Sequence, residues 1–419
     1  MTDRAAGYVT DIGYTRAYHR ELNPLATRLA FLQAGLEPPR IGTACELGFG
    51  QGVSLAIHAA ATPIRWWGCD LNAGHVRFAR SLDNASGAAS TLVEATFGEF
   101  AARDDLPLFD FIGLQGVLSW VSAENRAVIA RFIADRLAPG GVVYTSSNTL
   151  AVWADMLPLR ELMADIALSG STGGTAERIG EALALTSRII DTHPLPARTL
   201  PGLAARHARL LDADRRYLAH EYFNRDWHPF AWPELRDLLA SAGLRHACPA
   251  QLSDQLDVLN LTAAQRLLLA ELTGTGLRET VREFLAAPSV RRDYWVRSEN
   301  PLSGAASRAA WEETRIVLTT RRDDLPEVVS GRCGELRLTS EAHAMLVDAL
   351  ADGRSRVLGD LSAAAAFDLA AAGHLAIAQS DEAIERCSAR ADRLNKALDA
   401  LDDENAVMAR ANAVTGGAA

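Results

Sequence analysis

The stretch Cys45-Glu46-Leu47-Gly48-Phe49-Gly50-Gln51-Gly52, CELGFGQG, connects a short apolar run at 41–47 to an apolar stretch with helical spacing at 53–60. A strand that leads through a glycine-rich turn into a helix is a cofactor site in open α/β sheets. The glycines let the backbone approach a ligand closely, and the start of the helix offers unpaired N–H groups. The stretch therefore predicts a cofactor-binding loop.

Two classes of cofactor compete for this loop. A dinucleotide site has the pattern G-x-G-x-x-G, which would require glycine where Val53 stands. A pyrophosphate would also be repelled by Glu46, whereas S-adenosylmethionine carries a sulfonium and an ammonium that an acid attracts. Asp70 follows Gly50 by 20 residues and ends the next apolar run, where a carboxylate accepts ribose hydroxyls. Sites for NAD share that acid, so it indicates a nucleoside without choosing the cofactor.

Apolar runs and amphipathic stretches alternate from the loop to about residue 150. We expect further strands at 64–69, 90–96, 109–114 and 142–146, with helices at 74–82 and 123–137. Continuous apolar strands that alternate with helices are typical of a parallel sheet covered on both faces. The predicted fold class is α/β with a Rossmann-like sheet.

The remaining segments are predicted to be mostly helical. The first 40 residues are expected to be mostly helix, and the pattern after residue 150 changes from alternating elements to helices. Expected features are a helix at 179–190, a long helix at 203–222, a linker at 301–308 and a final helix from Asp381 to about Ala409.

The bulk composition limits the classes of protein that this chain can represent. The net charge of −10 argues against binding of nucleic acid or an anionic membrane, and no apolar run is long enough to span a membrane. Five scattered cysteines indicate a reduced, cytoplasmic chain without disulfides or zinc. His220 and Glu221 are adjacent and would point in different directions on a helix, so domain packing is favoured over a metal site. No feature of the sequence indicates the oligomeric state.

Several motifs together resemble a known family. ELGFGQG with CDLN (69–72) resembles the first two motifs of class I S-adenosylmethionine-dependent methyltransferases. Residues 109–153 resemble bacterial methyltransferases with a methyltransferase regulatory domain, which include rickettsial protein-lysine methyltransferases. Residues 217–244 and 281–297 resemble the two ends of that domain. The resemblance implies a methyltransferase domain over 1–155, a helical regulatory domain over 156–300, and a small, mostly helical C-terminal domain over 309–419.

The resemblance also implies which residues bind the cofactor. Glu46 would hold the methionine ammonium, and Asp70 would accept the ribose hydroxyls. Tyr14 would contribute a cofactor contact. The remaining cofactor-binding residues implied are Gly48, Gly50 and Gly52 under the methionine and the ribose, Leu71 on the adenine, and Thr96 and Phe97 at the adenine edge.

The residues near the expected methyl-transfer point depart from the family pattern. Gln115 stands where the family has histidine, and Ser147 where it has tyrosine. Gln115 would lie over the methyl group, contact the cofactor and orient an acceptor, but an amide is a poor base. Trp120 is expected to line the pocket and Asn148 to hydrogen-bond the acceptor. If the acceptor is an amine, water, Tyr14, Tyr18 or His19 could take its proton.

These residues support more than one functional hypothesis. The first is an S-adenosylmethionine-dependent methyltransferase that transfers methyl in line to a nucleophile. The acceptor would be a protein lysine, or alternatively a small molecule or saccharide with a hydroxyl or amine. A binding module that holds S-adenosylmethionine without transferring methyl is a second hypothesis. An NAD oxidoreductase is disfavoured by Glu46 and Val53.

Overall fold

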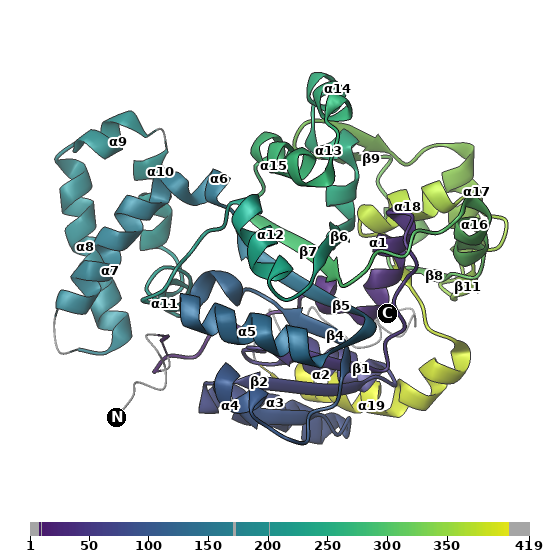
Figure 1. The fold of residues 1–419 in the computed structure, drawn as a ribbon, viewed down its shortest axis with the longest axis horizontal. Helices are drawn as coiled ribbons and strands as arrows, with labels where there is room; N and C mark the ends of the chain where they lie inside the picture. The colour runs from purple at the N-terminus through teal and green to yellow at the C-terminus, as the bar shows by residue number, and fades with distance from the viewer. Residues whose placement is uncertain (1–7, 10, 171–172, 201, 402–419) are drawn as a thin grey trace.

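A seven-stranded sheet runs through the middle of the molecule, with helices on both faces (Figure 1). The computed structural model describes residues 8–9, 11–170, 173–200 and 202–401. The strand order is β3-β2-β1-β4-β5-β7-β6, in which β1 to β5 are parallel and β7 is antiparallel to both of its neighbours. The strands are β1 Thr43–Leu47, β2 Arg65–Asp70, β3 Thr91–Glu94, β4 Phe109–Leu114, β5 Leu137–Asn148, β6 Arg245–Pro249 and β7 Val290–Val296. The predicted α/β fold and its five parallel strands are confirmed.

Helices cover the two faces of this sheet and leave its carboxyl edge to loops. One face packs against α1 (Thr27–Gln33), α2 (Val53–Ala61) and α3 (Ala73–Ser86). The other packs against α4 (Phe97–Ala101), α5 (Ala123–Arg136) and α12 (Trp232–Ala240). All five residues of β1 are buried, as expected for a central strand covered on both faces.

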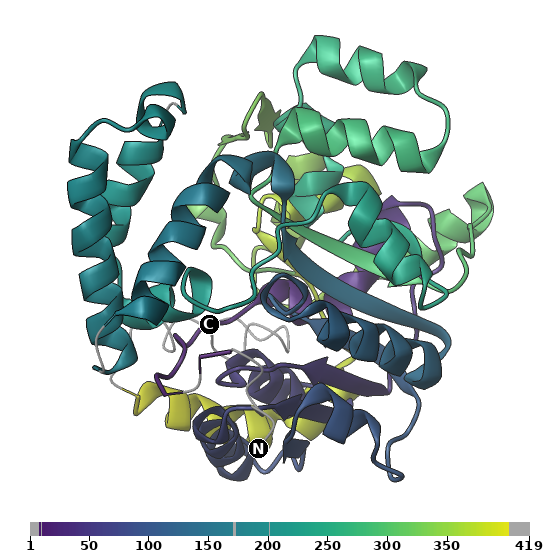
Figure 2. The same ribbon diagram turned by 60° about the vertical axis from the view of Figure 1, so that its left-hand side comes forward.

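A helical arm leaves the sheet after β5 and projects to the left in Figure 1. It is built from α7 and α8, and α11 packs against α8 at its base. Figure 2 shows this arm standing beside the sheet. Its elements are α6 Leu150–Trp153, η4 Ala154–Met156, α7 Leu157–Ser169, α8 Thr175–Asp191, α9 Leu195–Thr199, α10 Leu203–Leu211 and α11 Arg215–Glu221.

The chain then returns to the sheet and completes it. β6 and β7 fall within 156–300, where a helical domain was predicted, yet they extend the sheet of the first 150 residues. Segments on both sides of the predicted boundary at residue 155 therefore contribute strands to the same sheet. Between these strands lie η5 Leu252–Gln255, α13 Asp257–Asn260, α14 Ala263–Glu271 and α15 Thr275–Ala286.

The C-terminal segment packs on the main body in two places. A small three-stranded sheet, β11-β8-β12, shares a core with Leu29 and Leu32 of α1. The last helix, α19, lies against α2 and α3. Its elements are α16 Gly304–Glu312, β8 Arg315–Leu318, η6 Arg322–Asp324, β9 Val328–Ser330, β10 Glu335–Arg337, α17 Glu341–Leu350, β11 Arg356–Val357, α18 Ala363–Ala371, β12 Leu375–Ile377 and α19 Asp381–Asp399.

Four sequence predictions of local structure differ from what the structure shows. Of the first 40 residues, those that the structure describes (8–9 and 11–40) are not mostly helix: helical geometry in them is confined to η1 Arg20–Leu22, η2 Pro24–Ala26 and α1. The long helix predicted at 203–222 is interrupted, because the Asp214 side chain accepts the Arg216 N–H and starts a new helix. The linker predicted at 301–308 contains the start of α16, which Ser303 caps. The final helix ends at Asp399, and residues 402–409 lie outside the described part of the chain.

Two absences hold for the residues that the structure describes. Within these ranges no helix is long and apolar enough to cross a membrane. The same ranges contain no group of three His, Cys, Asp or Glu side chains that could hold a metal ion.

Candidate active site

The glycine-rich loop between β1 and α2 has three glycines in the left-handed region, with φ of +69° at Gly48, +57° at Gly50 and +68° at Gly52. They serve different purposes. A Cβ on Gly52 would lie 2.6 Å from the Cβ of Ala79 on α3, whereas a Cβ on Gly50 would meet nothing within 4 Å. Gly52 therefore lets α2 start close against α3, and Gly50 leaves the space beside the loop open.

Asp70 at the end of β2 fixes the loop from the neighbouring strand. Its Oδ2 accepts the Gly50 N–H at 2.8 Å, and its Oδ1 accepts the Asn72 N–H at 2.8 Å. The same Oδ1 lies 3.1 Å from Nδ1 of His75. A carboxylate offers about four lone-pair positions, so these contacts leave about one for a further donor. Accepting both ribose hydroxyls would therefore require one of the existing contacts to be released.

Glu46 is the penultimate residue of β1 and is 3% exposed. No described residue donates a hydrogen bond to its Oε2, although that atom is buried. Burial, and secondarily the charge of Asp70, raises the pKa of Glu46 to about 8. A buried carboxylate without a partner is costly and is suited to a cationic ligand.

A strap formed by residues 8–9 and 11–19 runs across the site from the opposite side. The Tyr14 N–H donates to Nε2 of His75 at 3.2 Å, and Gln51 donates to the Tyr14 carbonyl at 3.1 Å. Further along the strap, the His19 N–H donates to Oγ of Ser54 at 2.8 Å. The strap is thereby tied to the glycine-rich loop, to α2 and to α3.

The last turn of α11 holds the strap from the other side. His220 lies 3.1 Å from the Tyr8 hydroxyl through Nδ1 and 3.0 Å from the Ile12 carbonyl through Nε2. Burial lowers the pKa of His220 to about 4, so the ring is neutral near pH 7, with Nε2–H donating to the carbonyl. The Tyr14 hydroxyl donates to Oε1 of Glu221 at 2.6 Å.

The ends of β4 and β5 provide the floor. Gln115 accepts the Tyr144 hydroxyl at 2.6 Å through Oε1, which leaves its amide nitrogen available to donate. The Gly116 N–H donates to Oγ of Ser146 at 2.7 Å and so fixes the turn after β4. Trp120 stacks on Trp227, with ring centroids 5.8 Å apart, and closes the side below the helical arm.

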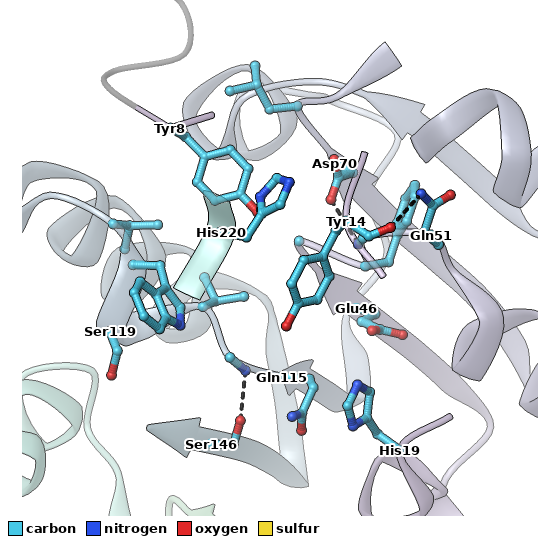
Figure 3. A pocket seen from close by; sticks show the side chains of 18 of the residues that line it. Tyr8, Tyr14, His19, Glu46, Gln51, Asp70, Gln115, Ser119, Ser146 and His220 are labelled. Atoms are coloured by element: carbon cyan, nitrogen blue, oxygen red, sulfur yellow. Dashed lines mark hydrogen bonds between the residues drawn. The ribbon is translucent and has the colours of Figure 1, made fainter. Parts of the chain in front are cut away.

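These parts enclose one cavity of about 400 Å³. Figure 3 shows His19, Glu46 and Gln115 at one end and Tyr8 and His220 at the other. The cavity brings together these predicted site residues: Tyr14, Glu46, Gly48, Gly50, Gly52, Asp70, Leu71, Thr96, Phe97, Gln115, Trp120 and Asn148.

Two predicted residues have surroundings that restrict their proposed roles. Tyr18 does not line the cavity; its ring packs beside His58 of α2, whose Nε2 lies 3.4 Å from the Tyr18 hydroxyl. Tyr18 is therefore excluded as the proton acceptor by its position. Thr96 caps α4, since its Oγ1 accepts the Glu99 N–H at 3.1 Å and its own N–H donates to Glu99 at 2.8 Å. The Thr96 backbone N–H is thus engaged in the cap, while its hydroxyl accepts there and keeps its own proton to donate.

Sequence reasoning missed the residues that the returning chain contributes to the cavity. Tyr217, His220 and Glu221 come from α11, and Arg292 comes from β7. His220 and Glu221 were interpreted as domain packing, and the structure gives them that contact and the cavity wall as well. Their partners Tyr8 and Tyr14 lie more than 200 residues away in the sequence, so no local spacing could have indicated the pairing.

Comparison with known proteins decides the family. The chain is 32% identical over 360 residues to the protein sll1526 of Synechocystis sp., a match that covers 85% of this chain and 71% of sll1526. The chain belongs to the sll1526 family. The chain is also 27% identical over 193 residues to the protein RP028 of Rickettsia prowazekii, a match that covers 45% of the chain and 76% of RP028.

A domain match and a fold match extend the comparison. Residues 214–297 match the model of a predicted methyltransferase regulatory domain. The structure of PKMT2 from Rickettsia typhi in complex with AdoHcy matches the structure of this chain with a TM-score of 0.65 and 17% identity, over 88% of this chain and 77% of PKMT2. At that identity the match shows a shared fold. The predicted resemblance to bacterial methyltransferases with a regulatory domain, and the predicted Rossmann-like methyltransferase fold, are confirmed.

Proposed function

We propose that this member of the sll1526 family is an S-adenosylmethionine-dependent methyltransferase. The buried, unpartnered Oε2 of Glu46 carries the proposal, because the methionine ammonium would supply the charge partner that this carboxyl lacks and would stabilise its ionised form. A dinucleotide would instead bring a pyrophosphate toward Glu46, and like charges repel. The fold that the chain shares with PKMT2, which was solved with AdoHcy, supports the same cofactor.

The residues of the loop fit this cofactor. Glu46 would accept the ammonium, and Asp70 would accept a ribose hydroxyl through its remaining lone pair. The open space beside Gly50 would admit the ligand close to the backbone. When bound, S-adenosylmethionine supplies an electrophilic methyl group on its sulfonium.

The chain's own residues orient the acceptor and exclude water. Gln115 presents an amide donor at the end of β4, and Asn148 lines the cavity from the end of β5. Trp120 and the strap cover the sides. Holding the two reactants in a fixed geometry lowers the entropic part of the activation barrier for methyl transfer. We propose an amine as the acceptor, in keeping with the protein lysine expected from the resemblance; a small-molecule acceptor is the alternative.

The proposed setting is the cytoplasm, without nucleic acid as a partner. All five cysteines are free, and four of them are buried. The net charge of −10 and a cavity lined by Glu46, Asp70, Glu221 and Asp226 disfavour a polyanionic substrate.

Equilibrium binding tests the proposed cofactor. Isothermal titration of the full chain with S-adenosylmethionine, S-adenosylhomocysteine and NAD is compared for wild type, Asp70→Ala, Glu46→Gln and the exposed control Asp237→Ala. We expect wild type and Asp237→Ala to bind the first two ligands and not NAD. Glu46→Gln should bind S-adenosylmethionine at least tenfold more weakly, and Asp70→Ala more weakly still. Binding of NAD alone, or of none of the three, would refute the proposal.

A further inference from the structure

Glu221 is a second carboxylate in the cavity that has no cation partner. It lies in the last turn of α11 and lines the cavity, while no described Lys, Arg or His nitrogen lies within 4.0 Å of its oxygens. The Tyr14 hydroxyl donates to Oε1 at 2.6 Å, and no described residue donates to Oε2. Burial raises the pKa of the Glu221 carboxyl. Glu221 therefore keeps an acceptor oxygen for something that enters the cavity.

The charges around the cavity distinguish Glu221 from its other acids. Glu46 and Asp70 belong to the cofactor loop, and Asp226 pairs with Arg225 at 3.1 Å. Glu221 is thus the carboxylate left over once the cofactor is bound. Arg292 is the one guanidinium among the described residues that line the cavity, and it lies on β7, where it donates to Gln251 at 3.4 Å instead of pairing with an acid.

The surroundings of Glu221 suit an ammonium on an alkyl chain. Tyr14, Tyr217 and Trp120 line the same cavity, and aromatic faces attract cations and pack against methylene groups. α11 and α8 pack against each other and share an apolar cluster that includes Ile179 and Leu183 of α8. The titratable or charged groups around Glu221 are Tyr8, Asp11 and Tyr14 of the strap, Asp70 and His75 of the cofactor side, Tyr217 and His220 of α11, Tyr222 just after it, and Asp226.

We propose that Glu221 binds the ammonium of the amine acceptor and then accepts its proton, with Tyr14 bridging the two. This inference rests on the proposed methyltransferase function. An alkylammonium has a pKa near about 10.4, so its nitrogen has no free lone pair at neutral pH until one proton leaves. The amide of Gln115 is not a base and Tyr18 lies outside the cavity, whereas His19 lines the cavity and is the competing candidate for this role.

The proposed step balances in protons and electrons. The Glu221 carboxylate takes one N–H proton, directly or through the Tyr14 oxygen, and becomes a neutral acid. The freed nitrogen lone pair forms the new N–CH3 bond as the carbon–sulfur bond breaks, and that bond's electron pair stays on sulfur. The product is a methylated ammonium and a neutral thioether, and Glu221 later releases its proton to water. A glutamate whose pKa is raised is better matched to this task than an exposed one.

The first test measures binding of an amine to the full chain saturated with S-adenosylhomocysteine. The probes are Nα-acetyl-lysine N-methylamide and its uncharged analogue Nα-acetyl-norleucine N-methylamide. Wild type should bind the lysine probe, more tightly at about pH 8 than at about pH 5, because Glu221 must be ionised. Glu221→Gln should lose at least tenfold in affinity for the lysine probe and none for the norleucine probe. Glu385→Gln, an exposed glutamate on α19, is the matched control and should behave as wild type.

A second measurement separates binding from proton transfer. Labelled methyl transfer to the lysine probe should fall in Glu221→Gln at saturating probe, and its rise with pH should move toward the pKa of the free amine. Equal binding of the lysine probe by wild type and Glu221→Gln, or no binding of it by wild type, would overturn the proposal. If either of these outcomes occurs while S-adenosylhomocysteine still binds, the proposed cofactor stands and only the role of Glu221 is rejected. If wild type does not bind S-adenosylhomocysteine, the proposed function itself is rejected.

Discussion

The two sides of the cavity are built in opposite ways. The part of the cofactor side that holds Glu46, the glycine-rich loop and Asp70 comes from one contiguous stretch, in which β1, the loop, α2 and β2 follow each other between residues 43 and 70. The facing side is assembled from the strap, α11 and β7, which lie more than 200 residues apart at their extremes. The first side is encoded by local spacing and the second only by the folded chain. The segment that matches a regulatory domain therefore supplies both cavity wall and sheet.

The largest effect is expected from truncating the chain so that it keeps the cofactor side of the cavity and loses α11 and β7 of the facing side. A fragment of residues 1–155 should not fold cooperatively, because β5 would lose β7 and become an exposed edge. Tyr144 and Val143 on β5, which are fully buried in the sheet, would become accessible. Circular dichroism and urea unfolding of the fragment check this. Cooperative unfolding of the isolated fragment would instead favour an independent domain that ends at residue 155.

The next largest effect on stability is expected from disrupting a buried cluster of charged residues around Asp293 on β7. Asp293 is 2% exposed and bonds to Arg291 at 2.9 Å and to His246 of β6 at 2.9 Å, which fastens the returning strands. Asp293→Ala should lower the free energy of unfolding by about 4 kcal/mol, since it leaves a buried cation short of a partner. The exposed Asp237→Ala is the control, and urea unfolding is the measurement.

The pH dependence of that effect has a definite sign. The Arg291 guanidinium and His246 hold the pKa of Asp293 well below its usual range, despite its burial. Asp293 therefore stabilises the fold above the unfolded value of about 3.9, and the contribution is lost as pH falls below it. The difference between wild type and Asp293→Ala should shrink in acid. A difference that stays constant would show that packing, not charge, is responsible.

The fold of the cofactor side was predictable because its determinants are close in sequence. Alternating apolar runs and helical spacing place β1 to β5 within a few residues of their observed bounds, and the glycine pattern places the loop. The facing side was not predictable by the same means. Glu221 and His220 stand in a helix whose pattern indicates packing, and only the strap's path brings Tyr14 and Tyr8 to them. β7 was missed because it is separated from β5 by the whole helical arm.

Substitution of two glycines tests whether the local sequence of the loop determines its conformation and its packing against α3. Gly52→Ala should cost about 3 kcal/mol, the sum of a left-handed residue and a clash with Ala79. Gly50→Ala should cost about 1 kcal/mol, because its added methyl meets nothing within 4 Å. Thermal and urea unfolding of both variants without ligand measure this. Equal costs would mean that φ alone matters and that the α2–α3 contact is unimportant.

The last effect concerns Glu46, the carboxyl group on β1 whose Oε2 has no described hydrogen-bond partner. The folded chain holds the Glu46 proton up to about pH 8, whereas an ordinary glutamate releases it near 4.5. The unfolded state thus binds fewer protons in this window, so the free energy of unfolding falls as pH rises. Between about pH 6 and about pH 8 wild type should lose about 2 kcal/mol relative to Glu46→Gln. Parallel pH profiles of the two proteins would contradict the assigned pKa.

Hydrogen exchange with and without S-adenosylhomocysteine tests most directly whether the two sides of the cavity contact the same ligand. Mass spectrometry of the full chain would follow residues 46–52 of the loop, 11–19 of the strap and 217–221 of α11. We expect the ligand to slow exchange in all three segments, because Tyr14 joins the loop to Glu221 across the cavity. Protection confined to the loop would mean that the strap and α11 do not take part in the ligand site.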